Sequence, residues 1–201
     1  MALDNLRAFI GAIDAAGDLR RVDRAVSTKL ELTEIADRVM KSPGGGPALL
    51  FERPALASGA ASSIPVATNL FGSERRMALA LGVERLDEIG ERIAELLHLK
   101  VPDGLLGKLA LLPRLAEMAK FPPRSISGRA PCQETVWREA DVDLARLPIP
   151  VCWPQDGGPY ITLAGIITRD PESGIWNVGM YRVQATGPRT VAMHWQRHKV
   201  G

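Results

Sequence analysis

The sequence predicts a mixed α and β protein, with a small N-terminal α/β domain at residues 1–122 followed by a mainly β half at residues 123–201. Two observations predict this organisation. Up to residue 98, segments with helical spacing of apolar residues alternate with short apolar runs, an order typical of α/β domains. Beyond residue 131, the helical spacing gives way to short β-type runs separated by turn residues such as Asp-Gly-Gly-Pro.

The elements of the first half follow from apolar spacing and from residues that start and stop helices. Apolar residues from Leu3 to Ile13 recur three and four positions apart, and Gly17 stands where a left-handed helix cap is expected. Ser73 is a typical N-cap, and Pro43 with the glycines after it ends the second helix. We therefore expect helices ending before Gly17 and at 32–42, 73–82 and 83–99, with strands at 19–26, 48–52 and 64–71.

A leucine-rich segment closes the first half, and the second half consists mainly of short strands. Residues 102–120 have helical character, but Pro113 is expected to kink or divide the helix. Residues 121–131 contain several turn-forming residues and are predicted to be irregular. Strands are predicted at 132–137, 161–169, 177–186 and 190–195, and the Gly-Pro-Arg-Thr turn between the last two predicts a β-hairpin over 177–195.

Composition and charge exclude several classes of function. The 25 basic and 23 acidic residues give a net charge of +2 and are spread along the chain, so no nucleic-acid partner is expected. The two cysteines, Cys132 and Cys152, lack zinc or disulfide spacing and are expected to be reduced thiols. The N-terminus lacks the features of a signal peptide, and no apolar run is long enough to cross a bilayer. These features predict a cytoplasmic protein.

Four features that resemble functional sites have simpler structural interpretations. The Gly-Gly-Gly-Pro run at 44–47 lacks the Gly-Lys-Ser/Thr of a phosphate loop and is expected to be a plain loop. The carboxylates of residues 84–95 have arginines among them and are expected to form a solvated, ion-paired helix face. His98 is expected to be a favourable charge at a helix C-terminus, and Cys132 an inert buried thiol.

The closing segment, residues 175–201, gathers side chains that can do chemistry, including two of the three histidines and two of the four tryptophans. In a regular strand Asn177 and Arg182 would face opposite ways, because the side-chain period is two. They can share a site only if the backbone is irregular between them, and Gly179 is the natural place for a bulge. On residue types alone, a hairpin with solvated Arg and His side chains is the simpler interpretation.

Several strings, in order along the chain, resemble the UbiD family of decarboxylases, named for the ubiquinone-pathway 4-hydroxy-3-polyprenylbenzoate carboxy-lyase. In the first half the strings are LRAFIGAIDAAGDLRRV, LELTEIADRV, GGGPALLFE and VATNLFGSERRMALALG. In the second half they are APCQETVW, DVDLARLPIPVCWPQDGGPYITLAGIITRDPESGIWNVGMYRVQ and MHWQRHKVG. The resemblance extends over essentially the whole chain.

This resemblance implies a fold, a reaction and cofactors. The fold is an N-terminal α/β domain followed by the first strands of a flavin-reductase-like split β-barrel that binds prenylated flavin mononucleotide (prenylated FMN). The reaction is reversible, non-oxidative decarboxylation of an aromatic or α,β-unsaturated carboxylic acid, in which the modified flavin takes up electron density as carbon dioxide leaves. A divalent cation, usually Mn²⁺, lies beside the flavin phosphate, and K⁺ is a second candidate ion.

The resemblance also implies roles for individual residues. Asn177 matches an asparagine that ligates the divalent metal, and Arg182 matches the catalytic arginine near the substrate carboxylate. Some relatives use a histidine of the closing stretch as a metal ligand, and His194 is the candidate for that role. The residues that match cofactor-contacting positions are Met180, Tyr181, Arg182, His194, Trp195, Gln196, Lys199 and Val200.

Family members run to well over twice the length of this chain, so these 201 residues are expected to lack later acidic groups of the site and to be inactive alone. The remainder of the enzyme or a partner chain would complete the site, and the full-length form is expected to be a homo-oligomer. A flavin prenyltransferase would supply the cofactor, and a polyprenyl benzoate substrate would bring the protein to the membrane periphery. Two alternatives stay open: a non-catalytic subunit or scaffold of a decarboxylase complex, and a split-barrel flavin oxidoreductase.

Overall fold

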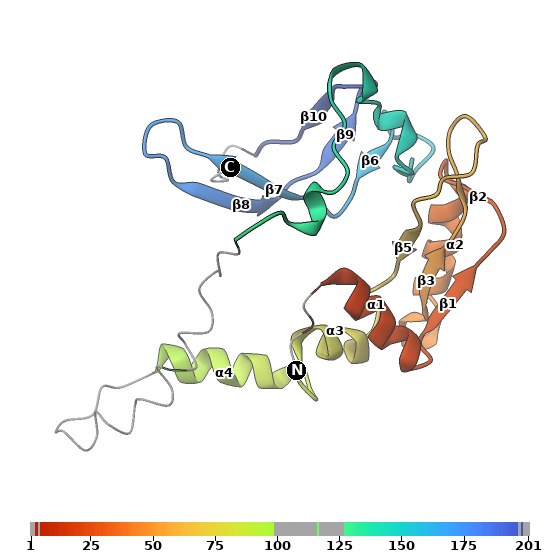
Figure 1. Ribbon diagram of the computed structural model, residues 1–201. Coiled ribbons are helices and arrows are strands. Elements are labelled where there is room, and N and C mark those ends of the chain that lie inside the picture. The colour runs from red at the N-terminus through yellow and green to blue at the C-terminus, as the bar shows by residue number, and fades with distance from the viewer. Residues whose placement is uncertain (1–2, 4, 99–115, 117–126, 197, 199–201) are drawn as a thin grey trace. The chain divides into compact units, whose positions relative to one another are not determined.

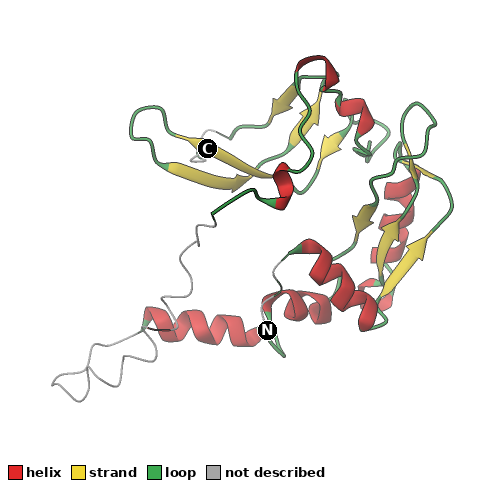
Figure 2. Ribbon diagram, in the orientation of Figure 1, coloured by secondary structure: helices red, strands yellow, loops and turns green. Residues whose placement is uncertain are grey.

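A computed structural model describes residues 3, 5–98, 116, 127–196 and 198 (Figure 1). The chain forms two compact units, of which the first combines residues 1–84 with 139–201 and the second comprises residues 85–138. Figure 2 shows helices and small sheets, and the described strands form no closed barrel. The predicted mixed α and β fold class is therefore confirmed.

The N-terminal part is a three-stranded sheet with helices beside it. The sheet has the order β1-β3-β5, with β1 (Leu19–Val22) parallel to β3 (Ala48–Phe51) and β5 (Val66–Thr68) antiparallel to β3. The remaining elements of residues 5–98 are α1 (Leu6–Ala15), β2 (Val26–Ser27), α2 (Glu31–Met40), the 3₁₀ helix η1 (Pro43–Gly45), β4 (Pro54–Ala55), α3 (Glu74–Leu81) and α4 (Asp87–Leu97).

All four residues of β3 are buried, and successive residues serve different clusters. Ala48 and Leu50 belong to a core with Phe9 and Ile13 of α1. Leu49 and Phe51 belong to a second core, whose other buried members are Val26 and Leu32. Because side chains alternate along a strand, β3 is covered on both faces, which explains its continuous apolar sequence.

Two helix caps that the sequence predicts, Ser73 and Gly17, are present in the structure. The side chain of Ser73 accepts a hydrogen bond from the Arg76 amide, and Gly17 and Gly82 take the left-handed conformation after α1 and α3. On α4, the Arg92 guanidinium lies 3.7 Å from the Glu88 carboxylate, and the guanidinium of Arg85, just before the helix, lies 3.9 Å from the Glu91 carboxylate. The expected ion-paired helix face is therefore confirmed.

The glycine run at 44–46 is a tightly packed loop. A Cβ atom at Gly45 would overlap the carbonyl of Gly72, and the φ angle of Gly45 is +83°. The Asn69 side-chain amide donates hydrogen bonds to the carbonyls of Gly45 at 2.7 Å and Pro47 at 2.9 Å. These contacts hold the loop to the start of α3, and its backbone serves packing as the plain-loop interpretation expects.

The second half contains two separate antiparallel ladders. One is the sheet β10-β9-β6, formed by β6 (Tyr160–Ile161), β9 (Val183–Ala185) and β10 (Val191–Met193). The other is a two-stranded ribbon of β7 (Gly165–Arg169) and β8 (Trp176–Met180). Three 3₁₀ helices precede them: η2 (Pro131–Gln133), η3 (Glu139–Asp141) and η4 (Leu144–Arg146).

The predicted hairpin is shorter than expected. The Thr186 amide donates to the Thr190 carbonyl at 3.0 Å, which closes a β9–β10 hairpin around the predicted turn. Residues 176–180, however, pair with β7 and not with β10. The strand predicted over 177–186 is therefore two strands, because the chain leaves one ladder after Met180 and joins the other at Val183.

The strand predicted at 132–137 is wrong. Residues 131–133 form a 3₁₀ helix, in which the Gln133 side chain accepts a hydrogen bond from the Ala130 amide at 3.1 Å. The Arg129 guanidinium donates to the carbonyls of Gln133 and Glu134. These local hydrogen bonds satisfy backbone groups that a ladder would otherwise use. The helix predicted at 102–120 lies outside the described residues, except for Ala116.

A backbone bridge joins the two halves of the first unit. The Leu30 amide donates to the Val151 carbonyl at 2.9 Å, and the Val151 amide donates to the Thr28 carbonyl at 3.0 Å. Segments far apart in the sequence thus share main-chain hydrogen bonds.

Within the part of the chain that the structure describes, no helix combines the length and apolar character needed to cross a bilayer.

Candidate functional site

Asn177 lies on the wall of a hollow of about 600 Å³. It stands opposite Thr168 in the β7–β8 ladder, and its amide nitrogen donates to the Thr168 hydroxyl at 3.4 Å. Its amide oxygen accepts no hydrogen bond from any described residue. The hollow is lined by Thr168, Arg169, Asp170, Pro171, Ser173, Ile175, Trp176, Asn177 and Trp195.

Trp195 and Tyr181 connect this hollow to the next segment of chain. Their ring centroids lie 5.2 Å apart with the rings tilted, and Tyr181 is buried. The Tyr181 ring packs over Gly179 so closely that a Cβ atom there would overlap it. The structure therefore brings together three of the predicted residues, Asn177, Tyr181 and Trp195.

The bulge expected at Gly179 is wrong. Gly179 pairs with Ile166 in a ladder that stays in register from Trp176 to Met180. The irregular backbone lies two residues later, at Tyr181 and Arg182, between the two ladders. An irregularity between Asn177 and Arg182 is thus present, but its cause is a change of sheet rather than an inserted residue.

Arg182 and His194 stand opposite each other, Arg182 just before β9 and His194 just after β10. The His194 amide donates to the Arg182 carbonyl at 3.0 Å, which extends the β9–β10 ladder by one step, and both side chains are exposed. Residues opposite each other in an antiparallel ladder share a face, so this pair lies on one face of the sheet.

The same face carries two residues that sequence reasoning missed. The Arg182 guanidinium carbon lies 5.8 Å from the centroid of the Tyr160 ring. Tyr160 stands opposite Gln184 in the β6–β9 ladder, and its hydroxyl donates to the Gln184 side chain at 3.3 Å. No sequence pattern indicates this cluster, because residues 160 and 182 meet only through strand register.

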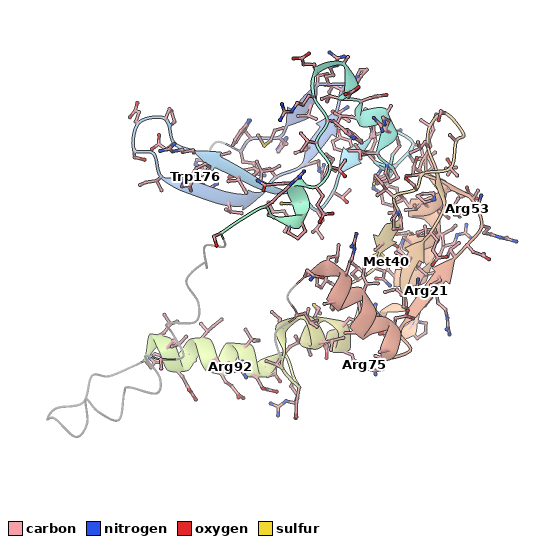
Figure 3. The ribbon with its side chains drawn as sticks, in the orientation of Figure 1. Arg21, Met40, Arg53, Arg75, Arg92 and Trp176 are labelled. Carbon is pink, nitrogen blue, oxygen red and sulfur yellow. The ribbon has the colours of Figure 1, made fainter. Side chains whose placement is uncertain are left out.

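The remaining predicted residues are not brought into this cluster. Met180 lies on the exposed face of the ribbon with Val178 and Trp176, the last of which is labelled on β8 in Figure 3. Gln196 is exposed. Lys199 and Val200, also predicted to contact a cofactor, lie outside the described residues.

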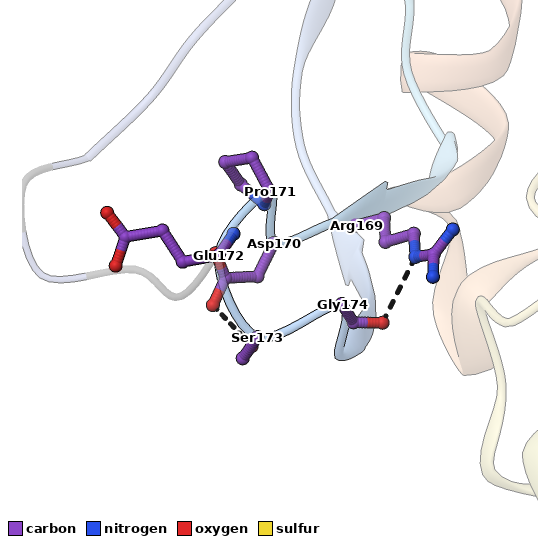
Figure 4. A pocket seen from close by; sticks show the side chains of 6 residues that line it. All are labelled: Arg169, Asp170, Pro171, Glu172, Ser173 and Gly174. Atoms are coloured by element: carbon purple, nitrogen blue, oxygen red, sulfur yellow. Dashed lines mark hydrogen bonds between the residues drawn. The ribbon is translucent and has the colours of Figure 1, made fainter.

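A second hollow, of about 460 Å³, lies at the tip of the β7–β8 ribbon (Figure 4). Its lining residues run consecutively from Arg169 to Gly174. The Ser173 hydroxyl and the Glu172 amide donate to the Asp170 carboxylate and hold its pKa below the usual range. The Arg169 guanidinium donates to the Gly174 carbonyl at 3.2 Å. These hydrogen bonds hold the turn between β7 and β8, and four of its residues also line the hollow at Asn177.

The donors near Asn177 suit part of a metal shell. An amide oxygen and a hydroxyl oxygen are hard ligands of the kind that Mn²⁺ and Mg²⁺ accept. The described residues hold no group of three or more His, Cys, Asp or Glu side chains able to bind a metal. The Thr168 hydroxyl accepts a hydrogen bond from the Asn177 amide nitrogen, so the amide oxygen of Asn177 is the hard ligand that the described residues leave open to a divalent ion. Cys132 is exposed, so its expected burial is wrong.

Two family models match the sequence. The model of the 3-octaprenyl-4-hydroxybenzoate carboxy-lyase N-terminal domain matches residues 10–93. The model of the 3-octaprenyl-4-hydroxybenzoate carboxy-lyase Rift-related domain matches residues 124–201.

Uncharacterized proteins of Archaeoglobus fulgidus and Aquifex aeolicus are each 46% identical to the chain, over 201 and 197 residues. The matches cover 100% and 98% of this chain but 39% of each relative, so the chain spans about two fifths of their length.

Solved structures agree with the family models. An evolved dimeric form of the UbiD-class enzyme HmfF from Pelotomaculum thermopropionicum, in complex with prFMN, is 30% identical with a TM-score of 0.69. The closed form of vanillic acid decarboxylase from Sedimentibacter hydroxybenzoicus is 26% identical with a TM-score of 0.72. Each alignment covers 96% of this chain, and 38% and 37% of the respective structures. The chain therefore belongs to the UbiD family of decarboxylases, of which it carries the N-terminal portion.

Proposed function

We propose that this chain is part of a longer enzyme that uses prenylated FMN to decarboxylate an aromatic or α,β-unsaturated carboxylic acid. The domain division proposed is 1–122 for the α/β domain and 123–201 for the first part of a split β-barrel. The likeness to a UbiD-class enzyme in complex with prFMN, over 96% of the chain, supports the choice of cofactor.

The observation that carries the proposal is the arrangement of residues 177–182. Asn177 presents, at a hollow on one ladder, an amide oxygen that accepts no hydrogen bond from the described residues, and Arg182 presents an exposed guanidinium where the next ladder begins. The two groups suit different parts of one reaction. An oxygen ligand can hold a cation beside a phosphate, and a guanidinium can hold a carboxylate through two parallel hydrogen bonds.

Arg182 would bind and orient the substrate carboxylate. The described residues place no carboxylate within ion-pair distance of it, so its donors can turn to a ligand. Holding the carboxylate at a fixed angle sets the orientation of the carbon–carbon bond that breaks when carbon dioxide leaves. The modified flavin, when bound, supplies the electron sink for that cleavage.

Asn177 would hold a divalent cation, proposed to be Mn²⁺, that offsets the charge of the flavin phosphate. Thr168 can add a second oxygen, and His194 stays a candidate further ligand. Tyr181 and Trp195 would form an aromatic wall beside the hollow. Met180, Gln196, Lys199 and Val200 stay proposed cofactor contacts.

The proposal implies several partners. They are a small carboxylic acid as substrate, the remainder of the enzyme, and a flavin prenyltransferase as supplier of the cofactor. K⁺ stays a second proposed ion. A homo-oligomer of the full-length form and a cytoplasmic location are likewise proposals.

The test is cofactor loading followed by carbon dioxide release. A protein containing these residues and the remaining family length would be co-expressed with a flavin prenyltransferase. Its absorption spectrum and intact mass would be recorded, and then carbon dioxide would be measured with a panel of aromatic and α,β-unsaturated acids. We expect prenylated FMN and release of carbon dioxide from at least one acid.

Two other outcomes would replace the proposal. Unmodified flavin that a nicotinamide reduces would identify an oxidoreductase. A stoichiometric complex without flavin on this chain would identify a scaffold subunit. The 201-residue chain, tested in parallel, is expected to release little or no carbon dioxide.

A further inference from the structure

The Tyr160 ring lies on the same sheet face as the Arg182 guanidinium. Tyr160 pairs with Gln184 and Ile161 pairs with Val183, so the β6–β9 register places Tyr160 beside the row that Gln184 and Arg182 share. The guanidinium carbon lies 5.8 Å from the ring centroid, within the range of a cation–π contact.

The ring itself is held from several sides. The Tyr160 amide donates to the Pro150 carbonyl at 2.9 Å, and the Tyr160 hydroxyl donates to the Gln184 amide oxygen at 3.3 Å. The Gln184 amide nitrogen lies against the loop before β6, where a Cβ atom at Gly157 or Gly158 would come within 3.2 Å or 3.1 Å of it. Tyr160 is half-buried, so its ring is fixed while the Arg182 side chain is exposed.

A ring at 5.8 Å limits the directions in which the Arg182 side chain can turn, and no described residue accepts a hydrogen bond from the five N–H donors of its guanidinium. Those donors stay available to a carboxylate, and the side chain loses part of its rotamer freedom before the ligand arrives. An exposed arginine without such support would lose that freedom on binding.

We propose that Tyr160, fixed by Gln184, is a positioning residue that holds the Arg182 guanidinium with its donor edge toward the substrate carboxylate. This inference rests on the carboxylate-binding role proposed for Arg182. It assigns a role to two residues that contact neither the metal-ligand candidate Asn177 nor its hollow.

The experiment uses the guanidinium Nε–Hε signals of the 201-residue chain in ¹⁵N NMR, with benzoate as the carboxylate probe. The signal that disappears from the spectrum of Arg182→Lys is assigned to Arg182. In the unaltered chain, the ring current of Tyr160 is expected to shift the Arg182 side-chain protons away from those of Arg189, an exposed arginine on the β9–β10 turn. This measurement needs no variant of Tyr160 and stands even if such variants fail to fold.

Two variants of Tyr160 separate the ring from its hydroxyl. Tyr160→Leu removes the ring and is expected to move the Arg182 signal toward that of Arg189 and to weaken benzoate binding about two- to fivefold. Tyr160→Phe keeps the ring and is expected to restore the ring-current shift and most of the affinity. A merely structural role would not predict this rescue together with a selective change at Arg182.

A matched pair in the ribbon provides the spectral control. The Arg169 guanidinium lies 5.4 Å from the Trp176 ring, so Trp176→Leu should move the Arg169 signal and leave the Arg182 signal in place. Unchanged Arg182 signals and unchanged benzoate affinity in Tyr160→Leu would refute the positioning role. A different result would refute only the carboxylate-binding role of Arg182. In that result, adding benzoate to the unaltered chain leaves the Arg182 signal in place, while the Tyr160→Leu substitution moves it.

Discussion

At the level of single residues, Asn177 and Arg182 are close in sequence but belong to different ladders. Each makes its own set of contacts, with Thr168 for Asn177 and with Tyr160 for Arg182. Their substitution should therefore have separable effects on the proposed enzyme.

Arg182→Ala is expected to abolish decarboxylation while much of the flavin stays bound, because it removes the carboxylate contact and leaves the metal ligand. Asn177→Ala is expected to lower metal and flavin content together. Activity, flavin absorbance and metal content in the cofactor-loaded full-length protein would check both, with Arg189→Ala as the control for loss of an exposed guanidinium. Equal flavin retention in the two variants would contradict this division of roles.

Gly179→Ala should destabilise the protein by about 1–3 kcal/mol, because the new methyl group overlaps the buried Tyr181 ring. Gly165→Ala is the matched control, since Gly165 lies on the partner strand β7 and a Cβ atom added there would have no atom within 4 Å. Urea unfolding would compare the two free energies of unfolding. Similar losses for both variants would show that strand entropy, and not the ring, sets the requirement for glycine.

At the level of helices and strands, the sequence predicted most elements of the first half because its helices carry apolar residues at helical spacing and β3 is a fully buried apolar run. The same reasoning located β10, but the strand predicted over 161–169 covers part of β6 as well as β7, and the strand predicted over 177–186 merged β8 with β9. Alternating apolar residues continue across Tyr181 and Arg182, and nothing in that pattern indicates a change of sheet partner. Arg182 was identified through the family resemblance. Tyr160 could not be identified, because it reaches Arg182 only through strand register.

Gly45→Ala tests how the loop before β3 depends on its backbone. The left-handed φ of Gly45 costs an alanine about 1–2 kcal/mol, and overlap with the Gly72 carbonyl adds a comparable amount. Gly44→Ala has a similar φ of +73° but open space around the Cβ position, so it isolates the first cost. The midpoint temperature of thermal unfolding should be clearly lower for Gly45→Ala than for Gly44→Ala. Equal midpoint temperatures would rule out the contribution of the overlap with the Gly72 carbonyl.

Across the protein as a whole, a buried arginine links segments that are distant in sequence. Arg76 is 1% exposed, and its guanidinium lies 2.7 Å from the carboxylate of Asp18, 58 residues earlier. Two of its nitrogens, Nε and Nη2, have no hydrogen-bond partner in the described structure. Among the described residues, the Asp18 carboxylate is therefore the group that compensates the buried charge of Arg76.

Asp18→Asn should destabilise the protein by about 3–5 kcal/mol, because it leaves a buried guanidinium without an opposite charge. Glu52→Gln removes an equally charged partner from the exposed pair with Arg21, where solvent screening makes the expected loss much smaller. Chemical denaturation of both variants would measure the difference. A loss for Asp18→Asn no larger than that for Glu52→Gln would mean that water or another group already compensates Arg76.

The change of sheet at Tyr181 and Arg182 also bears on amide hydrogen exchange. The ribbon and the three-stranded sheet form separate ladders, and cooperative opening tends to follow such hydrogen-bonded units. Amides of β8 and of β9, though neighbours in sequence, should therefore exchange with solvent at different rates. If Asn177 binds Mn²⁺, added Mn²⁺ should slow amide exchange in the β7–β8 ribbon before it does so in the three-stranded sheet. Local opening of the ribbon would then release the ion while the Arg182 guanidinium, on the other sheet, stays in place.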